Sequence, residues 1–268
     1  MLTANKMSFS FQWFPGHIGR ARRELKPLVS QAQIVFHILD ARAPSAAFYP
    51  ELIQKRKAVI VFAKTDLADL NLTLQWKEWF ENKGYPVYLS RKNDTLQELK
   101  KADFWKKSSL FGKAVVTGLP NVGKSTFINC LVGRKKAKTG KIPGITRGPQ
   151  WIKLDERMYL LDTPGIFYPQ NLPEAKAWRL AALGIIPESR YTEFVFEVGN
   201  LLIQYVRENY GVFKNQPEDF SSFLEIFGRS QGILSKGGNV HLENAALRLI
   251  REFQAGKWGR ITLEKPTK

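Results

Sequence analysis

One nine-residue stretch, from Gly118 to Thr126, constrains the fold of this 268-residue chain more than any other. It reads Gly-Leu-Pro-Asn-Val-Gly-Lys-Ser-Thr and fits the phosphate-binding pattern G-x-x-x-x-G-K-[ST]. The apolar run Lys113–Thr117 before it predicts a buried strand, and Thr126–Leu131 after it predicts a helix with an inward face. The pattern requires this strand–loop–helix context, because the N–H groups of the loop and the helix N-terminus bind phosphate together.

Each residue of this loop has an expected role at the phosphates of a nucleotide. Lys124 should reach the β- and γ-phosphates, and the hydroxyl of Ser125 should ligate Mg²⁺. The glycines allow backbone N–H groups to close around the phosphate oxygens. The expected nucleotide-binding residues of the loop are Leu119, Pro120, Asn121, Val122, Gly123, Lys124, Ser125 and Thr126.

The segments around the loop alternate between strand and helix patterns. Apolar runs predict buried parallel strands at 34–39 and 58–62, and further strand patterns lie at 85–90, 149–155 and 158–161. Helical patterns lie at 18–32, 71–83 and 95–107, and the side chains available for burial in the second are Leu74, Trp76, Trp79 and Phe80. The alternation predicts a three-layer α/β domain with a mostly parallel sheet and a phosphate site at the carboxyl ends of its strands.

The chain changes character near Asn171, where the strand patterns stop. Helical patterns follow at 173–183, 190–208, 217–227 and 240–253. In the second of these, apolar side chains recur at the spacing typical of a helix that packs into a core, namely Phe194, Val198, Leu201, Leu202 and Tyr205. We therefore expect a nucleotide-binding domain over residues 1–171 and an all-helical domain over residues 172–268.

The chain is strongly basic, and the charge is unevenly distributed. It holds 41 Lys and Arg against 24 Asp and Glu, a formal charge of +17. Residues 172–268 hold 13 of the basic and 11 of the acidic residues, so residues 1–171 hold the other 28 and 13. A charge of this size predicts a nucleic acid or another polyanion as partner. The alternative is a generically basic surface, which the asymmetry between the two parts disfavours.

Composition also bears on the compartment. No apolar run approaches the roughly 20 residues of a membrane span, and the first residues have no signal-peptide apolar core. The single cysteine, Cys130, excludes an intramolecular disulfide and a cysteine-rich metal site. We expect a cytoplasmic protein without a membrane partner.

Two motifs downstream of the phosphate-binding loop indicate a nucleotide switch. Asp162-x-x-Gly165 ends a predicted strand, so that its carboxylate can hold Mg²⁺ through water and the Gly165 N–H can contact the γ-phosphate. Thr146 lies between the two motifs, in the basic, glycine-rich segment 133–150, which reads as a mobile loop. A threonine there can ligate Mg²⁺ only while a γ-phosphate is present.

A third motif concerns the base. Lys64-x-Asp66 follows a predicted strand and is similar to the guanine-reading pattern Asn-Lys-x-Asp. The Asp66 carboxylate can accept hydrogen bonds from guanine N1–H and the exocyclic amine, a pairing that adenine lacks, and the Lys64 stem can stack over the base. Two departures weaken the match: Ala63 replaces the usual Asn, and the usual Ser-Ala of the fifth GTPase motif appears as Ser90-Arg91.

The order of these motifs is unusual, since the guanine motif precedes the phosphate-binding loop. This is the order of the circularly permuted GTPases, and among them the chain closely resembles the ribosome biogenesis GTPase A (YlqF/RbgA) family. The matching segments are Trp13–His17, Asp40–Pro44, Gly118–Thr126, Pro143–Gly148, Asp162–Gly165 and Phe253–Glu264. The resemblance implies a three-layer P-loop GTPase domain with permuted motif order, followed by a helical domain that binds RNA.

The resemblance also implies what the protein does. Members of the family are GTP-hydrolysing switches that bind GTP and GDP with Mg²⁺ and act on the large ribosomal subunit and its rRNA late in assembly. We expect a monomer whose hydrolysis is slow alone and stimulated by the ribosome. Asn121 matches an asparagine that such GTPases use to hold potassium, which implies K⁺ as a further cofactor.

Two of the three histidines, His17 and His37, have different expected roles. The residue after Asp162-x-x-Gly165 is Ile166, whereas Ras-like enzymes place a catalytic Gln there. The resemblance implies that His17 acts on water instead, although composition alone favours a turn histidine without chemistry. His37 lies inside the predicted strand 34–39 and is expected to be a hydrogen-bonded core residue.

Two other functions stay open at this point. An ATP-using P-loop enzyme is permitted by Ala63, because the Asn that it replaces normally bonds the base and ties the guanine motif to the P-loop. Asp66 nevertheless favours guanine over adenine, because a site built on such pairing discriminates strongly. A nucleotide-gated RNA-binding module with negligible catalysis is the other alternative, and hydrolysis rates with and without ribosomal subunits separate it from a GTPase.

Overall fold

The computed structural model describes residues 11–12, 27, 30–50, 53, 58–91, 93–103, 105, 112–132, 150–154, 158–162 and 171–267. Several predictions fall outside these residues and stay predictions. They are most of the helix at 18–32, the loop that carries Thr146, and the positions of His17, Gly165 and Ile166.

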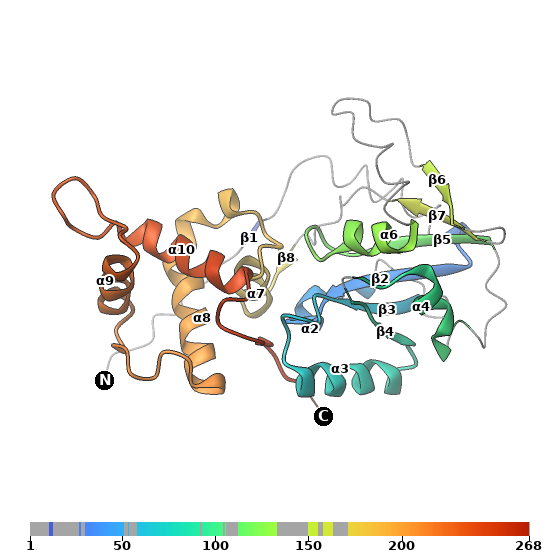
Figure 1. Ribbon diagram of the computed structural model, residues 1–268, viewed down its shortest axis with the longest axis horizontal. Coiled ribbons are helices and arrows are strands. Elements are labelled where there is room, and N and C mark those ends of the chain that lie inside the picture. Colours follow the sequence, from blue (N-terminus) through green and yellow to red (C-terminus); the bar gives the residue numbers. More distant parts are fainter. Residues whose placement is uncertain are drawn as a thin grey trace. The chain divides into compact units, whose positions relative to one another are not determined.

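Six strands form one sheet in the order β4-β3-β2-β5-β7-β6 (Figure 1). Their bounds are Ile34–Asp40 for β2, Ala58–Ala63 for β3, Val87–Leu89 for β4, Gly112–Thr117 for β5, Gln150–Lys153 for β6 and Met158–Asp162 for β7. Neighbouring strands run parallel except β6, which pairs antiparallel with β7. The mostly parallel sheet is thus confirmed, with β4 and β6 shorter than expected.

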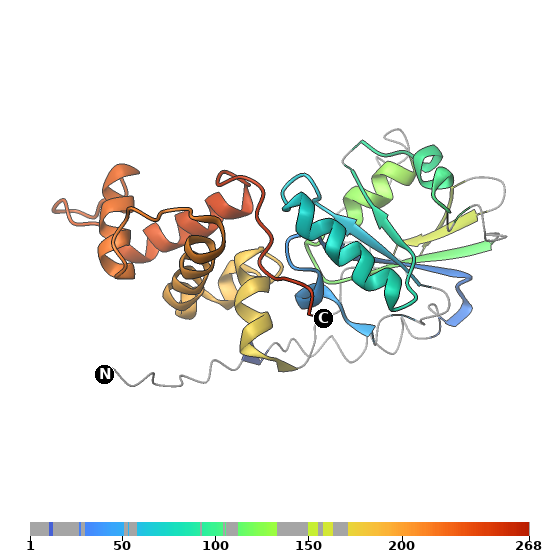
Figure 2. The same cartoon turned by 90° about the horizontal axis from the view of Figure 1, so that it is seen from below.

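Helices cover both faces of this sheet, as the three-layer prediction requires. The helix α3, Leu70–Asn82, crosses one face, and α6, Lys124–Val132, lies on the other (Figures 1 and 2). The ring of Phe80 on α3 lies 5.8 Å from that of Phe62 on β3. The ring of Phe127 on α6 lies 5.4 Å from that of Phe36 on β2. Every residue of β2 and β3 is therefore buried, which explains why both strands read as continuous apolar runs.

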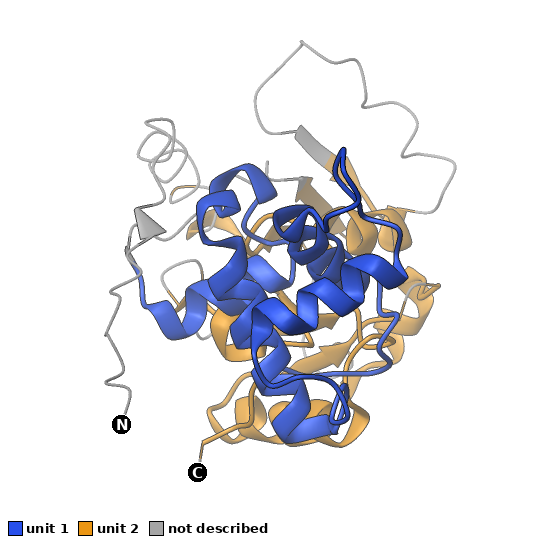
Figure 3. Cartoon of the chain, turned by 90° about the vertical axis from the view of Figure 1, so that its left-hand side faces the viewer, with its two compact units in different colours: residues 1–13, 169–263 blue, residues 14–168, 264–268 orange. Residues whose placement is uncertain are grey.

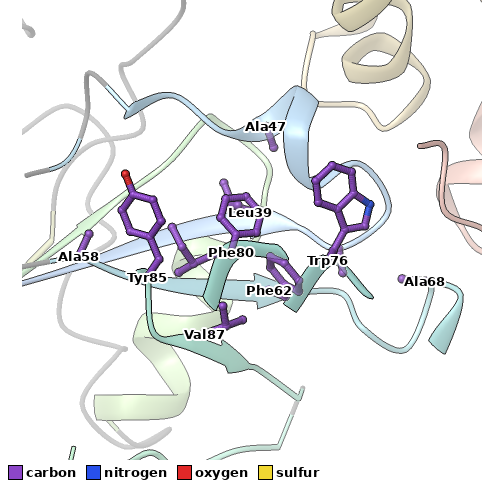
Figure 4. Packing of buried hydrophobic residues seen from close by; sticks show 11 residues of the cluster. Leu39, Ala47, Ala58, Phe62, Ala68, Trp76, Phe80, Tyr85 and Val87 are labelled. Carbon is purple, nitrogen blue, oxygen red and sulfur yellow. The ribbon is translucent and has the colours of Figure 1, made fainter. Parts of the chain in front are cut away.

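An aromatic cluster joins α3 to the sheet (Figure 4). Trp76 and Phe80 are buried against β2 and β3, and Phe48 stands edge-on to Phe80 at 5.1 Å between ring centroids. The expectation that Leu74 is buried was wrong, since 48% of that residue is exposed. The buried stripe of α3 runs through Thr73, Trp76 and Phe80, at spacings of three and four, which leaves Leu74 on the outer face.

Within the predicted helix at 95–107, α4 spans Leu96–Lys101, and the described residues Asp103 and Trp105 are again helical. The helix α4 begins with a capping box, in which the Glu98 carboxylate accepts hydrogen bonds from the backbone N–H and the hydroxyl of Thr95. It ends because Ala102 adopts an extended conformation, with φ −64° and ψ 144°. A short helix, α2, spans Pro44–Ala47 directly after β2.

Four further helices of the described residues belong to a second compact unit. They are α7 at Glu174–Ala182, α8 at Val195–Tyr210, α9 at Phe220–Ser230 and α10 at Leu242–Gln254. The start of the predicted helix 190–208 is instead two 3₁₀ turns, Glu188–Arg190 and Thr192–Phe194. The buried face of α8 includes Val198 and Leu202, as predicted, whereas Phe194, Leu201 and Tyr205 are only partly buried.

The expectation that strands stop at Asn171 was wrong in one detail. The short strand β8, Asn171–Leu172, pairs antiparallel with β1, Phe11–Gln12. Two-residue strands carry no alternation that a sequence pattern could reveal, and their partners here lie about 160 positions apart in the chain.

Among the helices of the described residues, none combines the length and the apolarity that a bilayer crossing requires.

Contacts divide the chain into two compact units, coloured in Figure 3. One comprises residues 1–13 and 169–263, and the other comprises residues 14–168 and 264–268. Relative to the expected division at 171, both chain ends belong to the opposite unit. β1 pairs with β8 in the helical unit, and the last residues pack on the α/β unit.

The C-terminal segment is an integral part of the α/β unit. The Glu264 carboxylate accepts hydrogen bonds from the backbone N–H groups of Ser45 and Ala46, the latter at 3.1 Å. The indole N–H groups of Trp76 and Trp79 donate to the carbonyls of Glu264 at 3.2 Å and Thr267 at 2.9 Å. Glu264 therefore caps the N-terminus of α2, which the N-cap residue Ala43 cannot cap with its own side chain.

Replacing Glu264 with Ala should destabilise the α/β unit by about 1–3 kcal/mol, because two helix N–H groups lose a charged acceptor. Hydrogen exchange of the peptide that covers residues 43–48 should accelerate in the variant. Glu225→Ala is the matched control, since Glu225 forms an exposed pair with Arg229 on α9 and such pairs contribute little. Unchanged exchange at 43–48 in Glu264→Ala would show that the cap is dispensable.

Candidate nucleotide-binding site

The phosphate-binding loop has the strained backbone that its glycines permit. It connects β5 to α6, with positive φ values of 137° at Gly118, 57° at Asn121 and 113° at Gly123. A Cβ on Gly118 would lie 2.5 Å from the carbonyl oxygen of Ile38 on β2. Only glycine fits at this position, so the loop is pressed against the end of the neighbouring strand.

The loop side chains that were predicted to bind phosphate and Mg²⁺ lie at the start of α6. Lys124 is buried, and its ammonium donates to the carbonyl of Gly118 at 3.0 Å and to that of Leu119. Ser125 and Thr126 follow on the first turn and are exposed. Leu119 and Val122 are buried and anchor the loop to the core. This arrangement presents cationic and hydroxyl groups at the N-terminus of a helix, where anions bind favourably.

The sheet brings the other predicted residues to the same edge. Asp40 ends β2, Ala63 ends β3, Ser90 follows β4, and Asp162 ends β7. All these strands run parallel to β5, which leads into the loop. Their carboxyl ends therefore meet at one edge of the sheet, where α/β proteins bind ligands. Asp162 is placed by its backbone, and Thr146, Gly165 and His17 lie outside the described residues.

Lys64 connects the guanine motif to the phosphate-binding loop. It adopts a positive φ of 58°, and its Nζ donates to the Asn121 carbonyl at 2.9 Å. The same Nζ lies 2.9 Å from Asp40 Oδ2. Asp66, two residues further on, is exposed at the same edge. The predicted base-binding and phosphate-binding motifs are thus in direct contact.

Asp40 is a fully buried carboxylate with two cationic partners. Arg42 donates to it from Nε at 3.0 Å and from Nη2 at 2.9 Å, and Lys64 is the second cation. Burial alone would raise the pKa of Asp40, but the charges and hydrogen bonds of Arg42 and Lys64 outweigh burial and hold this pKa well below its usual range. The family resemblance includes Asp40 only within the segment Asp40–Pro44, and no sequence pattern predicts its two ion pairs.

Ala63 lies directly beneath the loop. It is buried, and a Cβ on Gly123 would come within 3.0 Å of the Ala63 methyl group. The position that usually holds an Asn therefore has only a methyl group facing the loop. Ala63 contributes packing here and has no polar side-chain atom with which to hold the base or the loop.

The fifth motif is held by side chains that sequence reasoning missed. Ser90 is buried, and Thr65 donates from Oγ1 to its carbonyl at 3.1 Å. The N–H of Arg91 and the hydroxyl of Tyr88 both donate to Asp94 Oδ2, at 2.8 and 2.7 Å. Burial, followed by the hydrogen bond to Asp94, raises the pKa of the Tyr88 phenol far above its ordinary value. Asp94 thus fixes the turn that carries Ser90 and Arg91 beside the guanine motif.

His37 lies on β2, in register with Thr117, the last residue before the loop. Its Nδ1 is 2.9 Å from Thr117 Oγ1, and the ring is fully buried. Its Nε2 has no hydrogen-bond partner among the described residues, so the expected core histidine is only half satisfied. Burial, reinforced by the charge of Lys124, lowers the pKa of His37 to about 3.

A P-loop on a parallel sheet, contacted by a guanine-type motif that comes earlier in the chain, defines a circularly permuted P-loop GTPase. The family model for a 50S ribosome-binding GTPase matches residues 113–215. Ribosome biogenesis GTPase A of Thermotoga maritima is 34% identical over 261 residues, covering 95% of this chain and 94% of the relative. The protein of that name from Bacillus pumilus is 34% identical over 281 residues, covering 96% and 99%.

Solved structures agree with these relatives. The GNP-bound structure of YlqF from T. maritima superimposes with a TM-score of 0.74 at 30% identity, covering 93% of this chain and 99% of the other. A GDP-bound YlqF structure also gives a TM-score of 0.74 and 30% identity, with coverage of 91% and 99%. This chain belongs to the ribosome biogenesis GTPase A family. It hydrolyses GTP and acts in ribosome biogenesis, as the resemblance implied.

The buried, neutral His37 should make the α/β unit acid-sensitive. Its folded pKa of about 3 lies below the 6.5 of an ordinary histidine, so the unfolded chain takes up the proton first as the pH falls. Stability is complete above about pH 6.5 and declines below it, by about 2 kcal/mol between pH 7 and pH 5. Denaturant unfolding at the two pH values should show His37→Gln losing less stability than wild type. Equal losses would mean that His37 titrates normally.

Proposed function

We propose that this GTPase is a switch that binds the large ribosomal subunit, through its rRNA, late in assembly. The observation that carries the proposal is the match of residues 113–215 to a model described as a 50S ribosome-binding GTPase. The excess of 28 basic over 13 acidic residues in the first 171 supports it, because phosphate contacts dominate binding to nucleic acid.

The two domains divide this work. Residues 1–171 bind the nucleotide and present most of the positive charge, and the helical domain, residues 172–268, contributes a second RNA-binding surface. GTP binding and hydrolysis change the first domain and thereby the affinity for the ribosome. The protein works as a monomer in the cytoplasm, and hydrolysis is slow until the ribosome stimulates it.

The roles at the nucleotide are those that the sequence motifs predict. Lys124 and the loop 119–126 bind the phosphates, and the Gly165 N–H contacts the γ-phosphate. Asp66, which is exposed after β3, accepts from guanine, and the Lys64 stem covers the base. The turn at Ser90 and Arg91 lies beside them, held by Thr65 and Asp94.

A magnesium ion fits the oxygen groups at this edge. Ser125 is exposed on the first turn of α6, and Asp162 ends β7, the strand that pairs with β5. Hydroxyl and carboxylate oxygens together with nucleotide phosphates are the ligands that Mg²⁺ prefers. Ser125 would hold the ion directly, Asp162 through water, and Thr146 in the GTP state. Bound Mg²⁺ neutralises charge that develops during phosphoryl transfer, and Asn121 would help to hold a potassium ion.

Nucleotide-dependent co-sedimentation with purified ribosomal subunits tests the main proposal. The protein should sediment with large subunits in the presence of a non-hydrolysable GTP analogue and less with GDP. If about six or more phosphates are contacted, affinity should fall by about 10³-fold between 50 and 200 mM salt. Binding to small subunits alone, or affinity that stays flat with salt, contradicts the proposal.

We further propose that His17 acts on the attacking water once the ribosome has placed it. Ile166 provides no polar side chain after Asp162-x-x-Gly165, so another group must orient the water. His17→Ala should leave GTP affinity and ribosome binding nearly intact but slow ribosome-stimulated hydrolysis by about 10²-fold or more. The measurement is single-turnover hydrolysis on large subunits. A rate within about twofold of wild type, well short of a general-base contribution, would leave His17 without a catalytic role.

A further inference from the structure

The contact between the guanine motif and the P-loop depends on one ammonium group. Lys64 Nζ donates to the carbonyl of Asn121 at 2.9 Å, and Asn121 belongs to the turn of the loop that would surround the phosphates. Ala63, the adjoining residue, has no polar side-chain atom to add to this connection. The position of Lys64 therefore matters more in this chain than it would beside an Asn.

A long lysine side chain does not hold such a position by itself. Its four-carbon stem has many rotamers, and Lys64 also occupies the left-handed region, with φ 58°, which costs free energy for a residue other than glycine. One opposing charge fixes the ammonium: Asp40 Oδ2 lies 2.9 Å from Nζ. Asp40 is fully buried, so solvent screens this attraction only weakly.

Arg42 holds Asp40 in the orientation that this requires. Its Nε and backbone N–H donate to Oδ1 at 3.0 and 3.1 Å, and its Nη2 donates to Oδ2 at 2.9 Å. Such a bidentate contact between a guanidinium and a carboxylate fixes the plane of the carboxylate. Oδ2 accepts from Arg42 and faces Lys64 as well, so the carboxylate links the end of β2 to the guanine motif.

We propose that Asp40 is a positioning residue for nucleotide binding: it fixes Lys64 against the Asn121 carbonyl and thereby holds the guanine motif on the P-loop. The interaction runs from the end of β2 through the end of β3 to the loop after β5, three neighbouring strands of the sheet. It supplies the connection that Ala63 cannot make. The proposal rests on the assignment of Lys64 to the nucleotide site in the proposed function.

A double-mutant cycle tests it, with affinity for a fluorescent GDP as the readout. Asp40→Asn and Lys64→Met should each weaken binding about tenfold or more, the range expected of a lost charge-assisted contact. The double variant should bind no more weakly than Lys64→Met alone, because Asp40 acts through Lys64. A merely structural role of Asp40 would weaken binding equally with and without Lys64, and additive losses overturn the proposal.

Two further variants keep the outcome decisive. Asp40→Asn leaves Arg42 buried without its partner, so Asp40→Asn/Arg42→Gln replaces both charges by groups that can still form a hydrogen bond and serves if the single variant does not fold. Lys77→Met is the matched lysine control, because Lys77 pairs with Glu81 on the outer part of α3 and should leave GDP affinity unchanged.

The arms separate two kinds of failure. If Lys64→Met binds GDP as tightly as wild type, the assignment of Lys64 to the site is wrong and the inference falls with it. If Lys64→Met weakens binding while Asp40→Asn and Asp40→Asn/Arg42→Gln bind GDP normally, the assignment of Lys64 stands and only the role of Asp40 is overturned. The expected result is weaker GDP binding in Asp40→Asn, in Lys64→Met and in their double variant, with no additivity between the two substitutions.

Discussion

The close approach of the phosphate-binding loop to the ends of β2 and β3 is the contact on which the site depends. A Cβ on Gly118 would collide with the Ile38 carbonyl, and a Cβ on Gly123 would press on the Ala63 methyl. Because the loop lies this close, Lys64 at the end of β3 can reach the Asn121 carbonyl. If the loop lay farther from β2 and β3, Lys64 could not reach it. The guanine motif and the P-loop would then be too far apart to bind the base and the phosphates of one nucleotide.

Parallel pairing explains how a permuted chain builds the same kind of site. The guanine motif follows β3 and precedes the P-loop after β5, yet both strands flank β2 and end at one edge of the sheet. What matters for the site is which strands are neighbours and in which direction they run. The order of these strands in the sequence affects only the segments that connect them, and not which strands end beside the site.

The charged residues of this protein have different roles according to their burial. The excess of 41 basic over 24 acidic residues gives the whole chain a net charge of +17, which suits a polyanionic partner. Buried charges act over short distances: Asp40 balances Arg42 and orders Lys64, and Glu264 caps α2 directly after the same strand. Both carboxylates thus act on the segment that follows β2, one from inside the strand and the other from the C-terminal end of the chain.

The sequence by itself determined the features that are written locally. Apolar runs identified the strands, the glycines and Lys124 identified the P-loop, and motif order identified the permuted GTPase class, since each depends on residues that are adjacent or at fixed spacing. Tertiary structure alone decided the pairing of Lys64 with Asp40 and Asn121, the cap that Glu264 places on α2, the pairing of β1 with β8, and the exposure of Leu74. Those contacts join residues up to 219 positions apart or depend on which side of a helix meets the sheet. Local patterns carry no information about them, because they exist only once the strands have been placed next to one another.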